Sequence, residues 1–576
     1  MNSPVLYRSV WLLVILVLAC GIVIPPLMDY DAAQIGTISM TMYQRNDWLT
    51  LLNRHYVGGA WYDYLDKPHM VYWSAIAGYK IFGLNHVGTR FFSVLSTLLA
   101  AYGTMRLGAH LYSRQVGAWA ALIFITSQAI MLANHDVRTD SLLTSFTLLA
   151  IWQLVLFIDT RKWLPLMAGF IFLAFGVGTK GLISAVVAGF VLLFYLLGKK
   201  DWQGIFNWKW PIGIFFFLLG LSPFLYAYYL QFDMHPEKLV NGTYGNSGVK
   251  FLLWSHSMDR FTGNRNLVAS PEFSFFFHTI LWAFLPWTIF LVSGVYGRIK
   301  ELFRTRFESQ YDREQLTFIG VWVVFLLMSL SHFKLPHYLN ILFPLFAIFS
   351  AAWLEGLSGG GEAGLQRLMK AQQFLAGIML VLAAILSVWF FPLTNIWVVV
   401  GLAPFVFVLV RLWRSGTGIG TPDRIILLTA TAALLVNFVL NTHFYRELGR
   451  YQAGNTMAAL IRSKGIDSSS VYLYGKVMRS FDFYTRRITP VLDSAGIVRE
   501  LVKGRSLYFF TTDNSGDTLR MQFPQAREVF VTPNQKITRL KLSFLNPATR
   551  ERGLAVAKLY ELTPAGLSAG AGSAGR

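Results

Sequence analysis

The chain has 576 residues, of which 54% are hydrophobic and 14% are charged, and its mean hydropathy is +0.47. Soluble domains carry about 25% charged residues, so this composition excludes an ordinary soluble protein and predicts an integral membrane protein. The formal net charge of +20 does not indicate nucleic-acid binding, because the basic residues are dispersed between apolar runs, as membrane topology signals are.

Apolar windows of about 17–25 residues predict about thirteen membrane-spanning helices. They lie at 9–28, 87–109, 116–133, 139–158, 163–178, 181–198, 210–232, 272–296, 315–330, 336–354, 372–391, 394–413 and 424–444. We interpret the first as an uncleaved signal anchor, because its apolar run continues past Cys20, the one cysteine of the sequence.

The distribution of Lys and Arg predicts that the N-terminus is cytoplasmic. Basic residues such as Arg114, Arg161 and Lys199 then lie on short inner loops, as the positive-inside rule requires. Thirteen spans would place everything after residue 444 on the outer side. We therefore expect a multi-pass membrane protein whose C-terminal domain lies outside the cytoplasm.

The first outer loop, 29–86, contains two apolar stretches that are too short to span a bilayer. Residues 33–42 and 70–82 are predicted to form interfacial helices, with aromatic residues such as Trp73 at headgroup level. They would wall a cavity that opens to lipid. Residues 1–444 form the predicted transmembrane domain.

The character of the sequence changes after residue 444. Residues 445–563 are predicted to form an α/β domain, with buried strands at Val471–Tyr474, Arg505–Thr511 and Glu528–Thr532. Residues 564–576 are rich in Gly, Ala and Ser and are predicted to be a disordered tail.

Six polar clusters emerge on the outer face in this topology. They are Asp29 with Asp31, Asp66 with Lys67, Asp136 to Asp140, Thr179 with Lys180, His256 to Arg265, and His332 to His337. Chance would distribute such clusters over both faces of the membrane. Their gathering on one face predicts one shared site.

Each cluster taken alone also has a structural interpretation. Asp29 and Asp31 are equally explained as helix caps, and Asp140 is more simply explained as one. Lys67 either binds a phosphate as a point charge or anchors the next helix in lipid headgroups. Function therefore depends on the clusters acting together.

The chain resembles the polyprenyl-phosphate-sugar-dependent glycosyltransferases of the C-type (GT-C) fold. The similarity is to family 39, which includes bacterial aminoarabinose transferases acting on lipid A and protein O-mannosyltransferases. The matching motifs are Asp31 through Ser39, Tyr64-Leu-Asp-Lys-Pro68, Arg138-Thr-Asp140, Thr179-Lys-Gly181, Arg260-Phe261, Leu285-Pro-Trp287, Lys334-Leu-Pro-His-Tyr338 and Ser480-Phe-Asp-Phe-Tyr484.

The resemblance implies roles for individual residues. Asp31 would be the catalytic base or would orient the acceptor, with Asp140 and Asp29 as further acidic candidates. Asp66 stands where aminoarabinose transferases carry Glu, as a supporting acid. The candidates for binding the donor phosphate are Lys67, Lys334, His337, Tyr338, Tyr64, Arg260 and Lys180.

One departure from the motif bears on the acceptor. The transferases read Asp-Glu-Thr-Arg-Tyr, whereas Gln34 replaces the Arg here and Ile35 replaces the Tyr. The expected activity is inverting transfer of a sugar from an undecaprenyl-phosphate donor to lipid A or another envelope glycan or lipid. Protein hydroxyls are the alternative acceptor. No cofactor is assigned, and the need for a divalent cation stays open.

A polytopic lipid or solute transporter is the competing functional class. Transporters place ionisable groups near the bilayer midplane and carry internal repeats. Here the acidic residues lie at predicted helix ends on one face, and no inverted repeat is evident. The pattern therefore favours an enzyme whose partners are a lipid-linked donor, an acceptor and membrane lipids.

Overall fold

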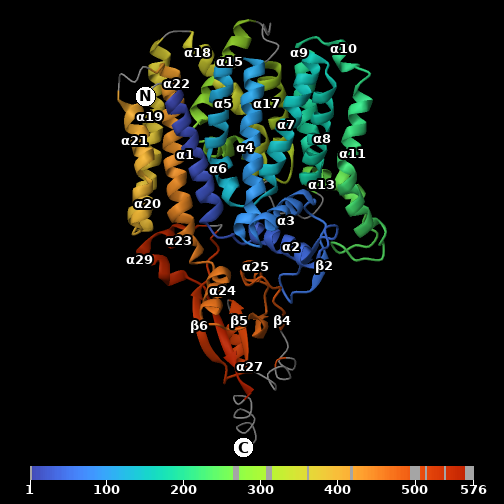
Figure 1. The fold of residues 1–576 in the computed structure, drawn as a ribbon, viewed down its shortest axis with the longest axis vertical. Helices are drawn as coiled ribbons and strands as arrows, with labels where there is room; N and C mark the ends of the chain where they lie inside the picture. The colour runs from blue at the N-terminus through green and yellow to red at the C-terminus, as the bar shows by residue number, and fades with distance from the viewer. Residues whose placement is uncertain are drawn as a thin grey trace, which may run out of the picture.

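The chain folds into an upright bundle of long helices with a smaller mixed sheet below it (Figure 1). The computed structural model describes residues 3–263, 272–305, 314–359, 362–414, 419–492, 498, 506–512, 515–537 and 540–564. The predicted disordered tail, apart from Pro564, and Arg265 of the fifth polar cluster lie outside the described residues.

The bundle contains most of the helices, several of which continue into a single π or 3₁₀ turn. Its helices are α1 Ser3–Val23, α4 His86–Leu111, α5 Arg114–Thr126, α6 Gln128–His135, α7 Thr139–Thr160, α8 Trp163–Lys180, α9 Ile183–Gly198, α10 Trp202–Ile205, α11 Trp210–Tyr228, α12 Gly248–Lys250, α13 His256–Thr262, α14 Phe275–Ala283, α15 Thr288–Arg304, α17 Val321–Leu330, α18 Phe343–Ser358, α19 Glu362–Ile385, α20 Ile396–Gly401, α21 Ala403–Trp413, α22 Thr421–Val439 and α23 Tyr445–Gly449.

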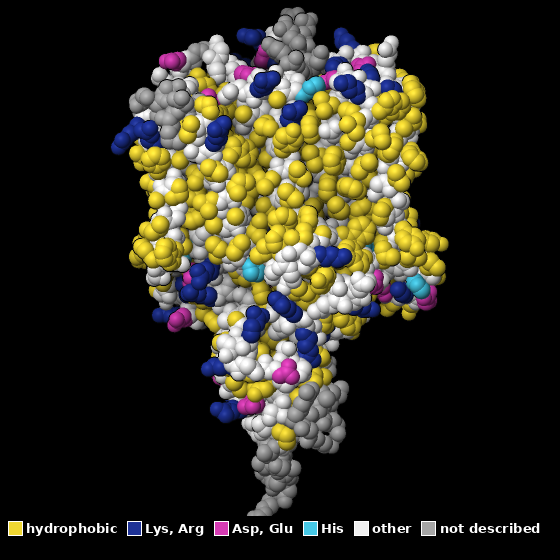
Figure 2. Space-filling view, viewed as in Figure 1, with side chains coloured by type: hydrophobic (Ala, Val, Ile, Leu, Met, Phe, Trp, Pro, Cys, Tyr) yellow, Lys and Arg dark blue, Asp and Glu magenta, His cyan; other side chains and the backbone are white. Residues whose placement is uncertain are grey.

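Within the described part of the chain, eight helical segments are long and apolar enough to cross a membrane, or up to nine if α5 and α6 form one bent span. Two shorter apolar helices, Ile183–Gly198 and Gln315–Leu330, accompany them. Figure 2 shows the corresponding apolar belt on one face, with Lys and Arg gathered above and below it. The protein is thus a multi-pass helical membrane protein, but the predicted count of thirteen spans is not confirmed.

Two of the predicted spans are broken rather than continuous, which corrects the prediction. The window 116–133 is bent by 55° between α5 and α6, because Ser127 adopts an extended conformation. The window 272–296 divides into α14 and α15 around Pro286, which has no N–H to donate within a helix. The two breaks are in contact, since the backbone N–H of Gln128 donates to the backbone carbonyl of Leu285 at 2.8 Å.

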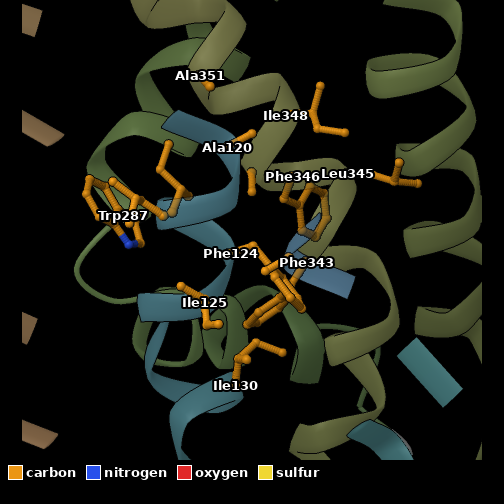
Figure 3. Packing of buried hydrophobic residues seen from close by; sticks show 14 of the residues in the cluster. Ala120, Phe124, Ile125, Ile130, Trp287, Phe343, Leu345, Phe346, Ile348 and Ala351 are labelled. Carbon is orange, nitrogen blue, oxygen red and sulfur yellow. The ribbon is translucent and has the colours of Figure 1, made fainter. Parts of the chain in front are cut away.

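The core of the bundle forms where α5 faces α18 and the second break. Figure 3 shows Phe124 and Ala120 of α5 pointing toward Phe343 and Phe346 of α18, with Trp287 alongside. The buried Trp287 indole donates to the Thr126 hydroxyl at 3.0 Å. This bond satisfies the polar end of a large side chain that is otherwise packed among apolar groups.

Two helices and a hairpin lie between the bundle and the sheet. They are α2 Asp31–Arg45, α3 Met70–Phe82 and the antiparallel pair β1 Leu52–Arg54 with β2 Trp61–Asp63. The interfacial helices predicted at 33–42 and 70–82 are therefore confirmed as helices. Both helices are partly buried. In α2, every residue from Ala32 to Met42 except Gln34 is buried.

The C-terminal part carries a five-stranded sheet in the order β4-β3-β5-β7-β6. Its strands are β3 Val471–Tyr474, β4 Val491–Leu492, β5 Leu507–Thr512, β6 Arg527–Pro533 and β7 Val556–Leu562. Its helices are α24 Ala453–Ser463, α25 Arg479–Thr485, α27 Ser515–Gln522, α28 Leu542–Leu545 and α29 Pro547–Arg550. β4, β3 and β5 are parallel, whereas β7 is antiparallel to both β5 and β6. The three predicted strands correspond to β3, β5 and β6.

Candidate active site

A polar cavity of about 410 Å³ lies where α2, α7, α8 and the first outer loop meet. Its lining includes members of all six polar clusters predicted to share a site. The charged and polar lining residues are Asp31, Gln34, Tyr62, Tyr64, Asp66, Lys67, Arg138, Thr139, Asp140, Lys180, Asn241, His256, Arg260, His337 and Tyr338.

Asp31 occupies the first turn of α2 and faces two cations. Its carboxylate accepts from Lys67 Nζ at 2.9 Å and lies 3.9 Å from Arg138 Nη1, while the side chain remains 45% exposed. Burial opposes ionisation of this carboxyl, but Lys67 and Arg138 outweigh it and lower the pKa of Asp31 to about 2. Asp31 is therefore ionised and reachable from the cavity.

Asp66, in the first outer loop, provides the second carboxylate of the polar cavity. Arg260 of α13 donates to it at 2.7 Å, and the Tyr64 hydroxyl donates at 3.1 Å. The Asp66 side chain is 42% exposed, and that of Arg260 is 18% exposed. The predicted candidates Tyr64, Asp66 and Arg260 thus form one connected group.

Asp140 lies at the N-terminus of α7, on the bundle side of the cavity. Lys180 at the end of α8 donates to it at 2.6 Å, and His337 Nε2 lies 3.6 Å away. The Asp140 side chain is only 3% exposed. Lys180 also lies over the Tyr338 ring, with 4.0 Å between Nζ and the ring centroid. This arrangement holds a buried charge pair against an aromatic wall.

An apolar cavity of about 290 Å³ adjoins the polar one. The two cavities share Lys180, His256, Arg260, Phe333 and Tyr338. The remaining lining of the apolar cavity comes from side chains such as Val186, Phe190, Phe276 and Val324. A single amphiphilic molecule can therefore place a charged end among the cations and a hydrocarbon chain beside α9, α14 and α17.

The four cations of the polar cavity each have a carboxylate partner. Lys67 pairs with Asp31, Lys180 with Asp140, Arg260 with Asp66, and Arg138 with Asp136. The pairs of Asp31 and Asp66 are partly exposed, so an anionic ligand that enters the cavity can compete for their cations.

The structure does not bring Asp29 into the cavity. Its buried carboxylate accepts bonds from the backbone N–H and the hydroxyl of Ser480, and its own N–H donates to the Gln452 side chain. Burial raises the pKa of Asp29, and the bonds from Ser480 oppose that rise. Asp29 therefore ties the start of α2 to the C-terminal domain.

Lys334 also lies outside the lining, so its predicted role in binding the donor phosphate stays a prediction. Phe333 and Leu335 both line the cavity, and Leu335 has extended backbone angles. Successive side chains of an extended segment point to opposite sides, so Lys334 points away from the cavity. Its ammonium donates to the Glu272 carbonyl at 3.1 Å.

Arg138 and His256 line the cavity but were not among the predicted site residues. Arg138 pairs with Asp136 at 2.6 Å and donates to His337 Nδ1 at 3.0 Å, so it joins the two sides of the cavity. Its place in the motif Arg138-Thr-Asp140 was a usable signal. Three or more potential metal ligands do not cluster anywhere in the described ranges.

Comparison with protein families identifies a matching domain. Residues 66–227 match the family model described as dolichyl-phosphate-mannose-protein mannosyltransferase. This segment contains Lys67, Arg138, Asp140 and Lys180 of the polar cavity.

Curated relatives match part of the chain. An uncharacterized protein from Aquifex aeolicus is 28% identical over 304 residues, covering 51% of this chain and 54% of the relative. An undecaprenyl phosphate-alpha-4-amino-4-deoxy-L-arabinose arabinosyl transferase from Edwardsiella ictaluri is 25% identical over 365 residues, covering 61% of each protein. The chain therefore matches less than two thirds of the length of these relatives.

Solved structures share the fold over nearly the whole chain. ArnT from Cupriavidus metallidurans in the apo state superposes with a TM-score of 0.72 at 17% identity, covering 98% of both chains. The same protein bound to undecaprenyl phosphate gives a TM-score of 0.69 at 18% identity, covering 97% of both chains. The resemblance to C-type glycosyltransferases is thus confirmed in the matching domain and in the fold.

Proposed function

We propose that this chain, with its mannosyltransferase-type domain in an ArnT-like fold, is a membrane glycosyltransferase that uses a polyprenyl-phosphate-linked sugar. The acceptor is lipid A or another glycan or lipid of the cell envelope. The curated relatives named as arabinosyl transferases support this class of donor and reaction. Protein hydroxyls are the second acceptor class, because the matching family model is named for protein mannosyltransferases.

The observation that carries the proposal is the pair of adjoining cavities. A polyprenyl-phosphate sugar is a long hydrocarbon with a phosphodiester and a sugar at one end. The cations of the polar cavity suit the phosphodiester, and the apolar cavity suits the first isoprene units. Arg260, Lys180 and Tyr338 belong to both cavities and would lie where phosphate and hydrocarbon join.

The partly exposed cations of the polar cavity suit a donor whose phosphate gains charge during the reaction. A phosphodiester carries one negative charge, whereas the released polyprenyl phosphate is a monoester with a second ionisable oxygen. Charge on the phosphate therefore grows as the bond to the sugar breaks. Cations aimed at this growing charge stabilise the transition state more than the bound donor, which is the condition for catalysis.

The proposed reaction is a direct displacement at the anomeric carbon. An acceptor oxygen forms a bond to C1 of the sugar while the bond between C1 and the phosphate oxygen breaks, with inversion at C1. The acceptor proton passes to Asp31, and the electron pair of the broken bond leaves with the lipid phosphate toward Lys67 and Arg260. A positioned base contributes about 10²–10⁴-fold to such a step.

Donor binding would prepare Asp31 for this role. A carboxylate whose pKa is about 2 is a weak base, because a general base works best with a pKa near the working pH. The donor phosphate competes with Asp31 for Lys67 and Arg138. Loss of these two partners raises the pKa of Asp31, so the base becomes stronger once the donor is in place.

The Lys and Arg distribution supports a cytoplasmic N-terminus, with the polar cavity and the C-terminal domain on the periplasmic side of the bacterial inner membrane. On that side the enzyme would meet the lipid-linked donor and envelope acceptors together. The domain boundaries proposed are residues 1–444 for the membrane domain and 445–563 for the periplasmic domain.

Binding of undecaprenyl phosphate to the purified protein in nanodiscs tests the donor assignment. We expect saturable binding of undecaprenyl phosphate. Undecaprenol, which lacks the phosphate, and a short-chain alkyl phosphate, which lacks most of the hydrocarbon, each fill only one cavity and should bind far more weakly. Equal binding of undecaprenol and undecaprenyl phosphate would remove the phosphate site and with it the proposed donor.

Mass spectrometry of lipid A, envelope glycans and envelope glycoproteins from cells with and without the gene tests the acceptor. A sugar lost from lipid A or another glycolipid supports the first acceptor class. A hexose lost only from protein hydroxyls would replace it by the second class.

A further inference from the structure

A basic and aromatic surface lies beside Asp31, outside the polar cavity. Tyr30 and Tyr56 of the first outer loop approach each other with 5.8 Å between ring centroids. Lys536 lies 5.7 Å and Arg479 5.8 Å from the centroid of Tyr30, and Lys476 lies 5.8 Å from that of Tyr56. We call these five residues the Tyr30 patch. Two parts of the chain, the outer loop and the C-terminal domain, build it together.

The Tyr30 patch is accessible, and two of its cations, Arg479 and Lys536, form no ion pair in the described part of the chain. Tyr30 is 42% and Tyr56 39% exposed, and Lys536 is exposed as well. Within the described ranges, neither Arg479 nor Lys536 pairs with a carboxylate, and the buried Nε–H of Arg479 has no hydrogen-bond partner. A buried, unpartnered guanidinium N–H costs free energy until an acceptor reaches it. Figure 2 shows Lys and Arg gathered where the apolar belt meets the C-terminal part.

The carboxylates beside the patch are already engaged. Asp29 accepts from the backbone and hydroxyl of Ser480, and Asp482 pairs with Arg54 at 3.1 Å, with both side chains of that pair at most 6% exposed. Asp29 attracts Arg479 electrostatically but forms no ion pair with it, and Asp482 is held by Arg54. The patch is therefore a positive surface with two tyrosine rings.

The position of the patch is fixed relative to the polar cavity. Tyr30 directly precedes Asp31, and Ile537, next to Lys536, packs in one apolar cluster with Met28. The Tyr56 carbonyl accepts from the Val477 amide at 2.8 Å, which ties the loop to the segment carrying Lys476 and Arg479. On the other flank, Tyr62 lines the cavity, and the charge of Arg479 opposes the rise in the pKa of Tyr62 that burial causes.

We propose that the Tyr30 patch is an acceptor subsite that binds an anionic group, such as a phosphate or carboxylate, on a saccharide acceptor. The cations receive the anionic group, and the exposed tyrosine rings stack against the C–H face of a sugar, which places a neighbouring hydroxyl toward Asp31. The C-terminal domain thereby supplies half of the acceptor site. This inference rests on the proposed function, because it assumes that Asp31 serves an acceptor.

Two weakly binding sugars test the subsite on the full chain in nanodiscs. Glucose 1-phosphate and methyl glucoside are titrated by saturation-transfer NMR, with undecaprenyl phosphate present to fill the polar cavity. We expect the phosphorylated sugar to bind more tightly and its affinity to fall as salt rises. Arg479→Gln and Lys536→Gln should each weaken its binding roughly two- to fivefold, the range for exposed ion pairs.

Matched variants separate recognition from folding. Arg479→Lys keeps a positive charge and should retain part of the affinity, while Tyr30→Leu should weaken both sugars. Lys464→Gln removes an exposed cation of the C-terminal domain outside the patch and should change neither sugar. Melting temperatures of all variants identify any that are misfolded.

Four results would overturn the subsite. The first is equal affinity of the wild-type protein for both sugars, and the second is loss of sugar binding in Lys67→Met but not in the patch variants. The third is an equal loss of sugar binding in Lys464→Gln and the patch variants, and the fourth is binding of an acidic peptide as tight as that of glucose 1-phosphate. The second would place the phosphate in the donor cavity, and the last would make the patch a peptide site. Donor-lipid binding is measured separately, so failure of the subsite is distinguishable from failure of the proposed function.

Discussion

The polar cavity has a loop side, formed by the first outer loop and the start of α2, and a bundle side, formed by α7 and α8. The two sides carry the same types of charged residue, but the exposed fractions of the side chains differ greatly. On the loop side, Asp31 is 45%, Asp66 42% and Lys67 22% exposed. On the bundle side, Asp140 is 3% and Lys180 14% exposed. Both sides hold a lysine–carboxylate pair, at 2.9 and 2.6 Å respectively.

Because of this difference in exposure, the two lysine–carboxylate pairs can serve different purposes. An exposed pair exchanges partners at little cost, because water compensates each charge when the pair opens. A buried pair cannot open without leaving a desolvated charge. We therefore expect the loop side to perform the chemistry and the bundle side to hold the cavity in shape.

The largest expected effect is on turnover, from Asp31→Asn. The amide keeps the shape of the carboxylate but cannot accept the acceptor proton, so turnover should fall by about 10²–10⁴-fold. Donor binding should be retained or tightened, because the change frees Lys67 and Arg138. The melting temperature should fall only slightly, because Asp31 is 45% exposed. Initial rates of sugar transfer and donor binding check the two halves of this expectation, and Asp29→Asn, which alters a buried anchor instead, is the stability control. Full activity of Asp31→Asn would leave Asp31 as a helix cap.

A comparable change on the bundle side should affect stability first. Lys180→Met leaves Asp140 buried beside fewer cations, and removing one partner of a buried pair costs about 3–5 kcal/mol. We expect a large drop in melting temperature and in the yield of folded protein. The double variant Asp140→Asn with Lys180→Met removes both charges and should recover much of the loss. If the single and double variants melt alike, the pair is not the element that stabilises this side.

Lys67→Met should reduce affinity for the donor. A charge-assisted hydrogen bond contributes about 1.5–3 kcal/mol, which corresponds to roughly a ten- to hundredfold loss of undecaprenyl phosphate binding. Lys80→Met is the matched control, because Lys80 belongs to the same loop but lies over the Trp48 ring, 4.4 Å from its centroid. Equal small losses for both variants would indicate only headgroup anchoring.

The smallest expected effect is a shift between two pH profiles. The free-enzyme pKa of Asp31 is about 2, so its charge should not limit kcat/KM between about pH 4 and 8. The donor complex should show a higher pKa, because the phosphate takes Lys67. The acid limb of kcat should thus lie at higher pH than that of kcat/KM, and coincident limbs would contradict the competition for Lys67.

The same pKa has a consequence for stability. The folded-state pKa of Asp31 lies below its ordinary value of 3.8, so its ion pairs stabilise the fold above about pH 4. That contribution is lost as the pH falls from about 4 toward 2. Asp31→Asn should therefore flatten the dependence of melting temperature on pH in this window.

The sequence indicated which polar clusters meet but not how each side chain points. Topology alone placed six clusters on one face, and all six contribute to the cavity. The position of Lys334 outside the lining was not predictable, because the orientation of one residue in an extended segment depends on register. The bonds that tie Asp29 to the C-terminal domain were not predictable either, because its partner, Ser480, lies 451 residues away in the chain.

The fold was predictable where a local pattern decides it. The bounds of α3 matched the predicted 70–82, since its apolar pattern and Pro68 are local signals. The break between α14 and α15 had a visible cause in Pro286, which a search for apolar windows ignores. β7 was missed, although Val556–Leu562 alternates buried and less buried residues, because its position between β5 and β6 is set by tertiary pairing.

The meeting of the two broken spans sets an order on biogenesis. The break at Ser127 leaves backbone groups that need partners within the bilayer. The Leu285 carbonyl accepts from the backbone N–H of Gln128, and the Trp287 indole donates to the side-chain hydroxyl of Thr126 beside the break. Trp287 follows Thr126 by 161 residues, which at about 5–20 residues per second takes roughly 10–30 seconds to synthesise. During this time α5 and α6 lie in the membrane without the contacts that Leu285 and Trp287 make at their bend.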